Sequence, residues 1–353
     1  MASTALPRPS NGPTTWYGPT LATQTQEWIW ELSPREIEEL EKAAAPLVVT
    51  GQEIGQLQAK DFRLPSLGLK LKALRQELIQ GKGFVLIKGL PISRYTEREI
   101  ITLFFGLGTH LGKARSQNAQ GHVLGHVRNL GLDSSDPKVR IYQTKERQTF
   151  HTDSCDVVGL LCLQPAKSGG RSLLVSADTV YKEMYKRRPD LLSLLLAPIA
   201  TDRRGEVPEG MLTYLLIPVF SHYQDKITPF YQRQYIESAQ RFPAAPRLTA
   251  KHLEALDLFD ELCNDPALHL SMMLEKGDMQ FVYNHAMLHD RTGFEDWEAL
   301  SQRRHLLRLW LSIPGDRPLP PVFATRYGTV EVGNRGGIVV PGTELNVPWI
   351  SDL

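Results

Sequence analysis

The tripeptide His151-Thr152-Asp153 constrains the fold of this chain more than any other short stretch. Successive side chains of a β-strand point to opposite faces, so a His and an Asp two residues apart on a strand share one face. One further His from a distant segment would complete the set of two histidines and one carboxylate that binds non-haem Fe(II) and leaves coordination positions open. The tripeptide alone occurs by chance in many proteins, so the hypothesis depends on the second half of the chain.

Two histidines in the second half of the chain are candidates for the third ligand. A Gly-Asp turn signal precedes them, and the apolar and aromatic residues that follow it predict one buried strand. His285 and His289 both fall on this strand and on the same face, and their separation along it allows only one of them to join the metal. The pattern by itself leaves the choice between them open.

A further predicted strand begins at Arg303 and carries basic and apolar residues. Alternation places Arg304, Leu306, Arg308 and Trp310 on one face and Arg303 on the other. An arginine that points into a metal pocket requires an anionic partner, because a buried unpaired charge is costly, and a planar guanidinium suits a carboxylate. The face with Leu306 and Trp310 is more typical of a pocket, so Arg304 is the preferred carboxylate-binding residue. A register shift of one residue would select Arg303 instead.

The order of a His-x-Asp motif, a distant His and an Arg a short way beyond resembles the Fe(II)/2-oxoglutarate dioxygenases of the taurine dioxygenase-like (TauD/TfdA) family, with its clavaminate synthase-like branch. The resemblance extends from about residue 83 to about residue 316. His289 is preferred to His285, because it leaves Arg304 at a spacing close to that of the family. The iron ligands that the resemblance implies are His151, Asp153 and His289.

The resemblance also implies residues for the cosubstrate 2-oxoglutarate. Arg304 would bind its distal carboxylate, and Ser172, which follows Gly169-Gly170 where the family usually has Thr, would share that carboxylate through its hydroxyl. Arg308 would contact either the cosubstrate or an anionic group of the substrate, and O2 would take the remaining position on the iron. The interval from His289 to Arg304 is longer than in taurine dioxygenase itself.

Substrate contacts are expected from a polar loop and from residues near the metal strands. In relatives the matching loop reaches the substrate, although a solvated loop would have the same composition. The candidate substrate residues are Ser116, Gln117, Asn118, Arg291 and His285. If Arg291 and Arg308 both face the pocket, they favour a small molecule with a carboxylate, sulfonate or amino-acid head group.

The implied fold is mainly β with surrounding helices, built on a double-stranded β-helix, the jelly-roll core that cupins also have. Residues 1–26, rich in Pro, Ser, Thr and Gly, predict a mobile N-terminal arm. Residues 27–353 are expected to form a single catalytic domain with N-terminal helices. Its insertion at about 201–243 contains several aromatic residues and is either a lid over the site or a set of further barrel strands.

Local signals predict the helices that precede the core. Ser33 to Glu36 form a capping box with Pro at the first helical position, so a helix should begin there and reach about Ala45. Another helix is expected from about Glu97 to Phe105. The glycine-rich stretch 106–112 that follows suits turns and close packing.

Bulk composition excludes several classes of partner. The net charge of +1 on 353 residues gives no electrostatic reason to expect a nucleic acid. No apolar run reaches the roughly 18 residues that a membrane span needs, so no membrane is expected. Three cysteines are too few for a disulfide framework and favour a cytoplasmic protein. The resemblance implies a small-molecule substrate. The sequence leaves a homo-oligomer open.

The resemblance implies an oxidoreductase that couples decarboxylation of 2-oxoglutarate to oxidation of an unactivated C–H bond. Hydroxylation is the default outcome, and desaturation or cyclisation would use the same ligands. A Zn-dependent hydrolase would use the same three side chains but would leave Arg304 and Arg308 without an anion. A catalytically silent barrel that senses a small carboxylate is the alternative outside the enzymes.

Overall fold

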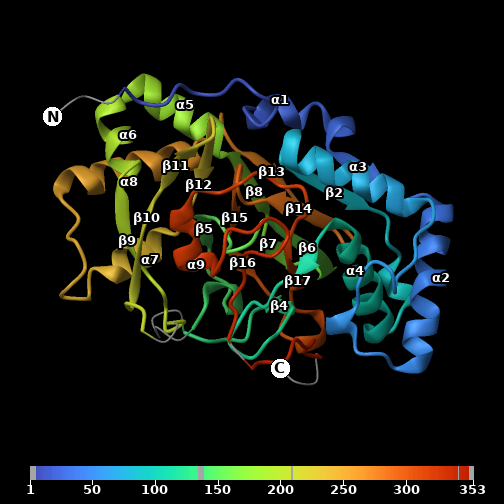
Figure 1. Ribbon diagram of the computed structural model, residues 1–353. Helices are drawn as coiled ribbons and strands as arrows, with labels where there is room; N and C mark the ends of the chain where they lie inside the picture. Colours follow the sequence, from blue (N-terminus) through green and yellow to red (C-terminus); the bar gives the residue numbers. More distant parts are fainter. Residues whose placement is uncertain (1–4, 134–138, 208–209, 341, 350–353) are drawn as a thin grey trace.

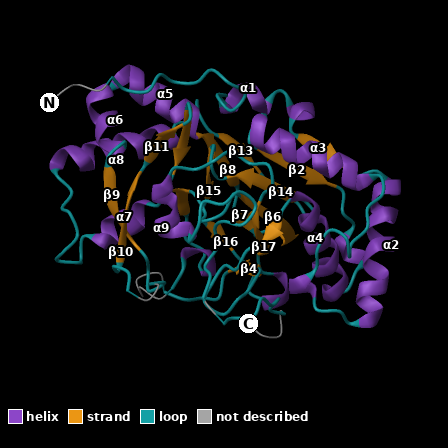
Figure 2. Ribbon diagram, in the orientation of Figure 1, coloured by secondary structure: helices purple, strands orange, loops and turns teal. Residues whose placement is uncertain are grey.

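Two β-sheets form the centre of the molecule, and helices surround them (Figures 1 and 2). The computed structural model describes residues 5–133, 139–207, 210–340 and 342–349. No helix in this described part is both long and apolar enough to cross a membrane.

The larger sheet has the strand order β1-β2-β14-β6-β17-β3, and β4 also pairs with β17. Its strands are β1 (Ile29–Glu31), β2 (Phe84–Lys88), β3 (Lys113–Ala114), β4 (Leu124–Arg128), β6 (Val157–Gln164), β14 (Met279–Tyr283) and β17 (His305–Ser312). The smaller sheet has the order β13-β8-β15-β5. Its strands are β5 (Gln148–His151), β8 (Ser172–Ser176), β13 (Leu270–Met272) and β15 (Met287–Arg291).

The chain passes back and forth between these two sheets. β5 and β8 belong to the smaller sheet, whereas β6, which lies between them in sequence, belongs to the larger one. In the same way, β15 of the smaller sheet follows β14 and precedes β17, which are both in the larger sheet. This alternation is that of a double-stranded β-helix, so the expected jelly-roll core is confirmed.

The segment expected as one strand after the Gly-Asp turn is two strands. β14 and β15 belong to different sheets, and residues 284–286 join them. The backbone N–H of Ala286 donates to the carbonyl of Tyr283 (3.2 Å) and closes this turn. The prediction that His285 and His289 share one strand face is therefore wrong, because His285 lies in the turn.

Nine helices lie in the described residues. They are α1 (Gly18–Ala22), α2 (Pro34–Thr50), α3 (Leu67–Gln80), α4 (Glu97–Leu111), α5 (Ala177–Arg187), α6 (Pro189–Leu195), α7 (Arg233–Ala239), α8 (Ala250–Asn264) and α9 (Ala324–Tyr327). α3 and α4 contact the larger sheet, and α2 packs on α4. α5, α6 and α8 form a second group, which packs on the smaller sheet through buried side chains such as Tyr181, Leu192 and Phe259.

Capping explains where α2 begins. The Ser33 hydroxyl accepts the backbone N–H of Glu36, and the Glu36 carboxylate accepts the backbone N–H of Ser33 (2.8 Å). α4 continues through the glycine-rich stretch, so the turn expected there is wrong. Close packing explains the glycine at position 106 of this helix, because an added Cβ would lie 2.4 Å from Cδ2 of Phe62.

The described part of the N-terminal arm, residues 5–26, packs against the body, in contrast to the expected mobile arm. Trp16 is buried, with its ring edge-on to Phe84 of β2 at 5.5 Å, and its indole N–H donates to the carbonyl of Lys82 (2.9 Å). The prediction of mobility was based on the average composition of the arm, and an average does not reveal that one buried tryptophan attaches the arm to the body. Residues 1–4 lie outside the described residues.

The described residues of the insertion form structure outside the two sheets. β9 (Pro198–Asp202) pairs with β10 (Tyr214–Pro218), β11 (Phe220–Tyr223) pairs with β12 (Lys226–Pro229), and α7 follows. Another short pair, β7 (Ser168–Gly169) with β16 (Phe294–Glu295), also lies apart from them. In the described part of the insertion no strand joins a central sheet, so the interpretation as further barrel strands is wrong. Residues 208 and 209 lie outside the described residues.

Replacing Trp16 by Ala should lower the free energy of unfolding by about 3–5 kcal/mol, because a buried indole and its hydrogen bond are lost. Val49→Ala is the control, since Val49 is 87% exposed on α2 and its truncation should change the free energy by less than about 0.5 kcal/mol. Urea unfolding of both variants measures the difference. Equal stability of the two variants would mean that the arm contributes no anchor.

Candidate active site

The register of the smaller sheet brings two histidines together. β5 and β15 are antiparallel neighbours, and His151 and His289 are directly opposed in their pairing. Directly opposed side chains on one face of a sheet are in contact, and here the imidazole centroids are 4.1 Å apart. Both rings are buried. The sheet therefore fixes the distance between the first two candidate ligands.

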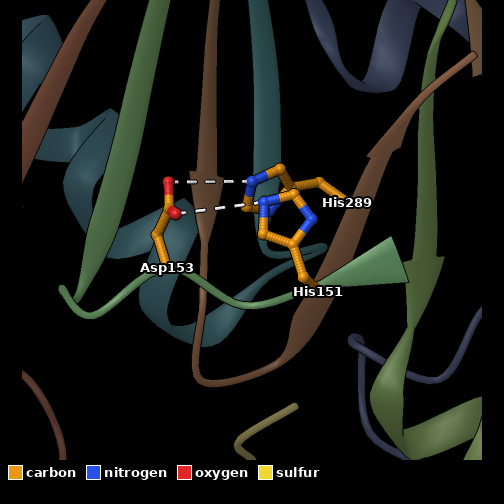
Figure 3. Close-up of side chains that lie close together, drawn as sticks. All are labelled: His151, Asp153 and His289. Carbon is orange, nitrogen blue, oxygen red and sulfur yellow. Dashed lines mark ion pairs between the residues drawn. The ribbon is translucent and has the colours of Figure 1, made fainter. Parts of the chain in front are cut away.

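Asp153 joins the two histidines from outside the strand. β5 ends at His151, so the expectation that His151 and Asp153 share a strand face is wrong. The carboxylate nevertheless faces both rings (Figure 3), with Oδ1 3.9 Å from Nε2 of His151 and Oδ2 3.7 Å from Nε2 of His289. One ligand atom from each of the three residues lies within 4.8 Å of the others. Two imidazoles and one carboxylate at this spacing fit Fe(II).

Hydrogen bonds orient these side chains. Nδ1 of His151 lies 2.9 Å from the carbonyl of Thr149, so Nδ1 carries the proton and Nε2 offers its lone pair. The indole N–H of Trp310 donates to Oδ2 of Asp153 (3.0 Å). The backbone N–H of Asp153 donates to the side-chain oxygen of Asn284 (3.0 Å).

Burial and neighbouring charges set the protonation of the three residues. Burial lowers the pKa of His289 to about 3, and it also lowers the pKa of His151. Burial alone raises the pKa of Asp153, but the charge of Arg308, whose Nη1 lies 3.7 Å from Oδ2, and the hydrogen bond from the Trp310 indole keep this pKa below its usual value. Near neutral pH the group is therefore two neutral imidazoles and a carboxylate, the state that binds a metal.

A narrow cavity of about 50 Å3 lies beside the three residues and contains two buried arginines, Arg291 and Arg304. Nη1 of Arg304 and Nε of Arg291 have no hydrogen-bond partner among the described residues. Burial lowers the pKa of Arg304 to about 10, and burial together with the charge of Arg304 lowers the pKa of Arg291 to about 9. Two desolvated guanidinium groups require an anion, and a dicarboxylate such as 2-oxoglutarate fits this demand.

Ser172 lies in the wall of the same cavity and donates its hydroxyl to Oε1 of Gln280 (2.9 Å). The Gly-Gly turn before it allows Arg304 to come close. Gly170 has φ +68°, and an added Cβ would lie 3.2 Å from Nε of Arg304. The sequence signal Gly-Gly-x-Ser thus has a steric reason in this structure.

The two adjacent arginines before β17 point in different directions. Arg304 lines the narrow cavity, whereas Nε of Arg303 donates to the carbonyl of Trp297 (3.2 Å) on the outside. Both residues precede β17, so the strand is shorter than expected, but the assignment of Arg304 to the pocket side agrees with the structure. Arg308 lies within the strand, and its guanidinium is 4.9 Å from the ring centre of Tyr142.

A second, wider cavity of about 350 Å3 meets the narrow one at the candidate ligands. The residues that line both cavities are Tyr142, Gln148, His151, Asp153 and Arg308. The side-chain amide nitrogen of Gln148 lies 2.9 Å from Nε2 of His151. The three-residue group therefore has an arginine-rich cavity on one side and an open cavity on the other.

Three segments distant in sequence, two loops and helix α9, meet in the wall of the wide cavity. Glu206 of the insertion accepts a hydrogen bond from Arg140 (2.6 Å) and another from Arg326 (3.1 Å). Sequence reasoning missed this Arg140–Glu206–Arg326 cluster as part of the site. Its members are separated by 66 and 120 residues, and no spacing rule links segments of that kind.

The five expected substrate residues fall in different places. Gln117 and Asn118 line the wide cavity, and Oε1 of Gln117 accepts a hydrogen bond from Nε of Arg308 (2.7 Å). Ser116 is buried and donates to the carbonyl of Asn118 (2.7 Å). Arg291 lines the narrow cavity and not the wide one, and so lies on the side of the cosubstrate.

His285 lies in the core, away from both cavities. It belongs to a second cluster of potential metal ligands with Asp156 and Asp316. Arg335 already supplies the cation there, with Nε 2.7 Å from Oδ1 of Asp156 and Nη2 2.7 Å from Oδ2 of Asp316. Nε2 of His285 lies 2.8 Å from Oδ1 of Asp156. This cluster is therefore a buried ion-pair network and not a second metal site.

A jelly-roll core with this donor set defines an iron-dependent oxygenase, and comparison with known proteins agrees. Residues 44–310 match the family described as taurine catabolism dioxygenase TauD, TfdA family. The match covers most of the chain, and the protein therefore belongs to the TauD/TfdA family. It is a dioxygenase whose cofactors are Fe(II) and 2-oxoglutarate, as the sequence predicts.

Relatives extend over nearly the whole chain. FR-33289 synthase of Streptomyces rubellomurinus is 30% identical over 328 residues, which cover 92% of this chain and 96% of that protein. The taurine hydroxylase-like protein SAT17 of Stachybotrys chartarum is 30% identical and covers 83% of this chain and 77% of its own length. A solved asparagine oxygenase, in complex with Fe(II), 3-hydroxyasparagine and succinate, has a TM-score of 0.63 at 16% identity, over 80% of this chain and 93% of that one. This last likeness concerns the fold alone.

His289→Ala should weaken Fe(II) binding more than about 100-fold and more strongly than His285→Ala does, because only His289 faces Asp153. Anaerobic Fe(II) titration of the two purified variants measures this. The assignment of His289 fails if the two variants lose iron in the opposite order.

The metal-free protein should lose stability as the pH falls from about 6.5 to about 3. The pKa of His289 and of His305 is about 3 in the fold and near 6.5 in the unfolded chain, so the unfolded chain takes up protons first. The stability that depends on these two histidines being neutral is complete above about pH 6.5 and is lost as the pH approaches about 3. Urea unfolding gives the free energy of unfolding at about pH 7 and at about pH 4.5. The loss of this free energy between the two pH values should be smaller for His289→Phe than for the native chain. Equal losses would contradict the lowered pKa of His289.

Proposed function

We propose that His151, Asp153 and His289 bind Fe(II) and that Arg304 and Ser172 bind the distal carboxylate of 2-oxoglutarate. The enzyme then oxidises an unactivated C–H bond of a small molecule with an anionic or amino-acid head group, by hydroxylation. The observation that carries this proposal is that two cavities of different size meet at His151 and Asp153, and that His289 lines the narrow one.

The narrow cavity suits the cosubstrate. Arg304 and Arg291 supply two positive charges that lack ion-pair partners among the described residues, and the wall contributes the Ser172 hydroxyl. A dicarboxylate bound at Arg304 would have its other end toward His151 and Asp153, which line the same cavity. Iron, 2-oxoglutarate and O2 together supply the oxidant and release succinate and CO2; the protein contributes orientation and exclusion of water.

The wide cavity suits the substrate. Its walls carry Arg140 and Arg326 with a single shared carboxylate, Glu206, so this cluster has an excess positive charge. Arg308 adds a guanidinium next to the metal group. An anionic group bound at the Arg140–Glu206–Arg326 cluster would leave the opposite end of a small molecule toward the iron. Gln117 and Asn118 also line this cavity, with Gln117 beside Arg308, and are proposed as substrate contacts.

The names of relatives support hydroxylation. The asparagine oxygenase was solved with a hydroxylated amino acid and succinate, and SAT17 is called taurine hydroxylase-like. Asparagine and taurine both carry an anionic group. We also propose that the insertion covers the wide cavity, since Thr201, Glu206, Leu215 and Tyr235 all line it.

Membership of a dioxygenase family removes support from the two alternatives. A Zn-dependent hydrolase has no use for two buried guanidinium groups, those of Arg304 and Arg291, that each keep one nitrogen without a hydrogen-bond partner among the described residues. A catalytically silent sensor of a small carboxylate would not need the wide cavity beside the complete set of His151, Asp153 and His289. Release of succinate from 2-oxoglutarate with Fe(II), in the presence of a panel of amino acids, sulfonates and phosphate esters, tests the class and the head group together.

Arg304→Ala should weaken 2-oxoglutarate binding by about 2–5 kcal/mol, roughly 30-fold to several thousand-fold, because a charge-assisted pair is lost and a carboxylate is left unpaired. Arg303→Ala is the matched control, since the neighbouring guanidinium contacts only backbone carbonyls on the outside. Titration of the Fe(II) charge-transfer band with 2-oxoglutarate compares the two variants. A larger loss in Arg303→Ala, or none in either variant, would refute the cosubstrate site.

A further inference from the structure

The loop from Asp153 to Asp156 carries a proposed iron ligand without the support of a strand. His151 and His289 are held by the pairing of β5 with β15, whereas Asp153 lies beyond the end of β5. Its position therefore depends on its own hydrogen bonds with Asn284 and Trp310 and on what fixes the rest of the loop before β6 begins at Val157.

The C-terminal segment after β17 lies directly against this loop. The backbone N–H of Gly337 donates to the carbonyl of Ser154 (2.7 Å), and Nε of Arg326 donates to its hydroxyl (2.8 Å). Gly336 has φ +77°, and an added Cβ would be 2.8 Å from the carbonyl oxygen of Ser154. The close approach of the two backbones thus requires glycine.

The far end of the loop is anchored by a buried charge pair. Oδ1 of Asp156 accepts hydrogen bonds from Arg335 (2.7 Å) and His285 (2.8 Å), and Oδ2 accepts from the Ser312 hydroxyl (3.2 Å) and the Ile313 N–H (2.8 Å). Both Asp156 and Arg335 are fully buried. A buried carboxylate with four donors has one position available to it, and the loop is fixed with it.

We propose that Arg335 is a positioning residue for the iron: by fixing Asp156 it sets where the carboxylate of Asp153 lies. The proposal rests on the ligand set proposed above. The family match ends at residue 310, so this contact comes from a part of the chain that the match does not cover. The C-terminal segment is then a component of the metal site although it contributes no ligand.

Arg335→Lys and Asp156→Asn should raise the dissociation constant for Fe(II) about 10- to 100-fold, the usual effect of losing a group that orients a ligand. The dissociation constant for 2-oxoglutarate at saturating Fe(II) should change less than about twofold, because Arg304 and Ser172 are not touched. Excess Fe(II) should restore succinate formation. Arg335→Lys keeps the buried positive charge, so this variant should still fold. It loses the two separate ion pairs that the guanidinium makes with Asp156 and Asp316.

Two controls separate this effect from others. Leu40→Ala creates a cavity in α2 and should lower the melting temperature while Fe(II) affinity stays unchanged. Asp153→Ala should abolish Fe(II) binding; if it does not, the ligand set itself is wrong. If Asp153→Ala loses iron while folded Arg335→Lys and Asp156→Asn bind it like the native chain, the positioning role alone is refuted.

Hydrogen exchange on the native chain decides the matter if the variants fail to fold. If the C-terminal segment stabilises the loop for iron, then bound iron must stabilise the C-terminal segment by the same free energy. Fe(II) should therefore slow the exchange of the backbone amide of Asp156 and also that of Gly337, whose N–H donates to the carbonyl of Ser154. Amides of α2 serve as the reference. Slower exchange in the loop without any change at Gly337 would overturn the proposal.

Discussion

The antiparallel pairing of β5 with β15 is the contact on which the site depends. It places His151 directly opposite His289, so that a spacing of more than a hundred residues in sequence becomes a contact between two rings. A slip of one residue in this register would turn one of the two histidines to the opposite face of the sheet. The spacing of the two histidines therefore comes from backbone pairing, whereas Asp153, beyond the end of β5, is placed by side-chain contacts.

The two sheets divide the chemistry between them. The smaller sheet supplies both histidines and Ser172, whereas the larger one supplies Arg308 and Trp310 from β17. Arg308 contacts the carboxylate of Asp153 and is itself fixed by Gln117, so positive charge is built into the site next to its one acidic group. Burial depresses the pKa of the histidines, and the arginine keeps the aspartate ionised; both effects favour a divalent cation.

Segments outside the two sheets complete the site. The insertion contributes Glu206, and the C-terminal segment contributes Arg326 and Arg335, which connect to the loop that carries Asp153. None of these three belongs to a strand of the core. The jelly roll thus supplies the two histidines, and the segments around it line the wide cavity and contact the loop that carries Asp153.

The sequence by itself determined the type of fold, the family and the three candidate ligands, because short motifs with strong local chemistry carry that information. It favoured Arg304 over Arg303 for the pocket through strand alternation, but both residues precede β17, so the structure and not alternation decided that choice. It did not determine that His285 lies in a turn, because apolar residues on both sides of a short turn have the pattern of one continuous strand.

Tertiary structure alone decided that His285 joins an ion-pair network, that the arm packs through Trp16, and that Arg140, Glu206 and Arg326 meet. These outcomes depend on contacts between segments far apart in the chain, and no local propensity encodes such contacts.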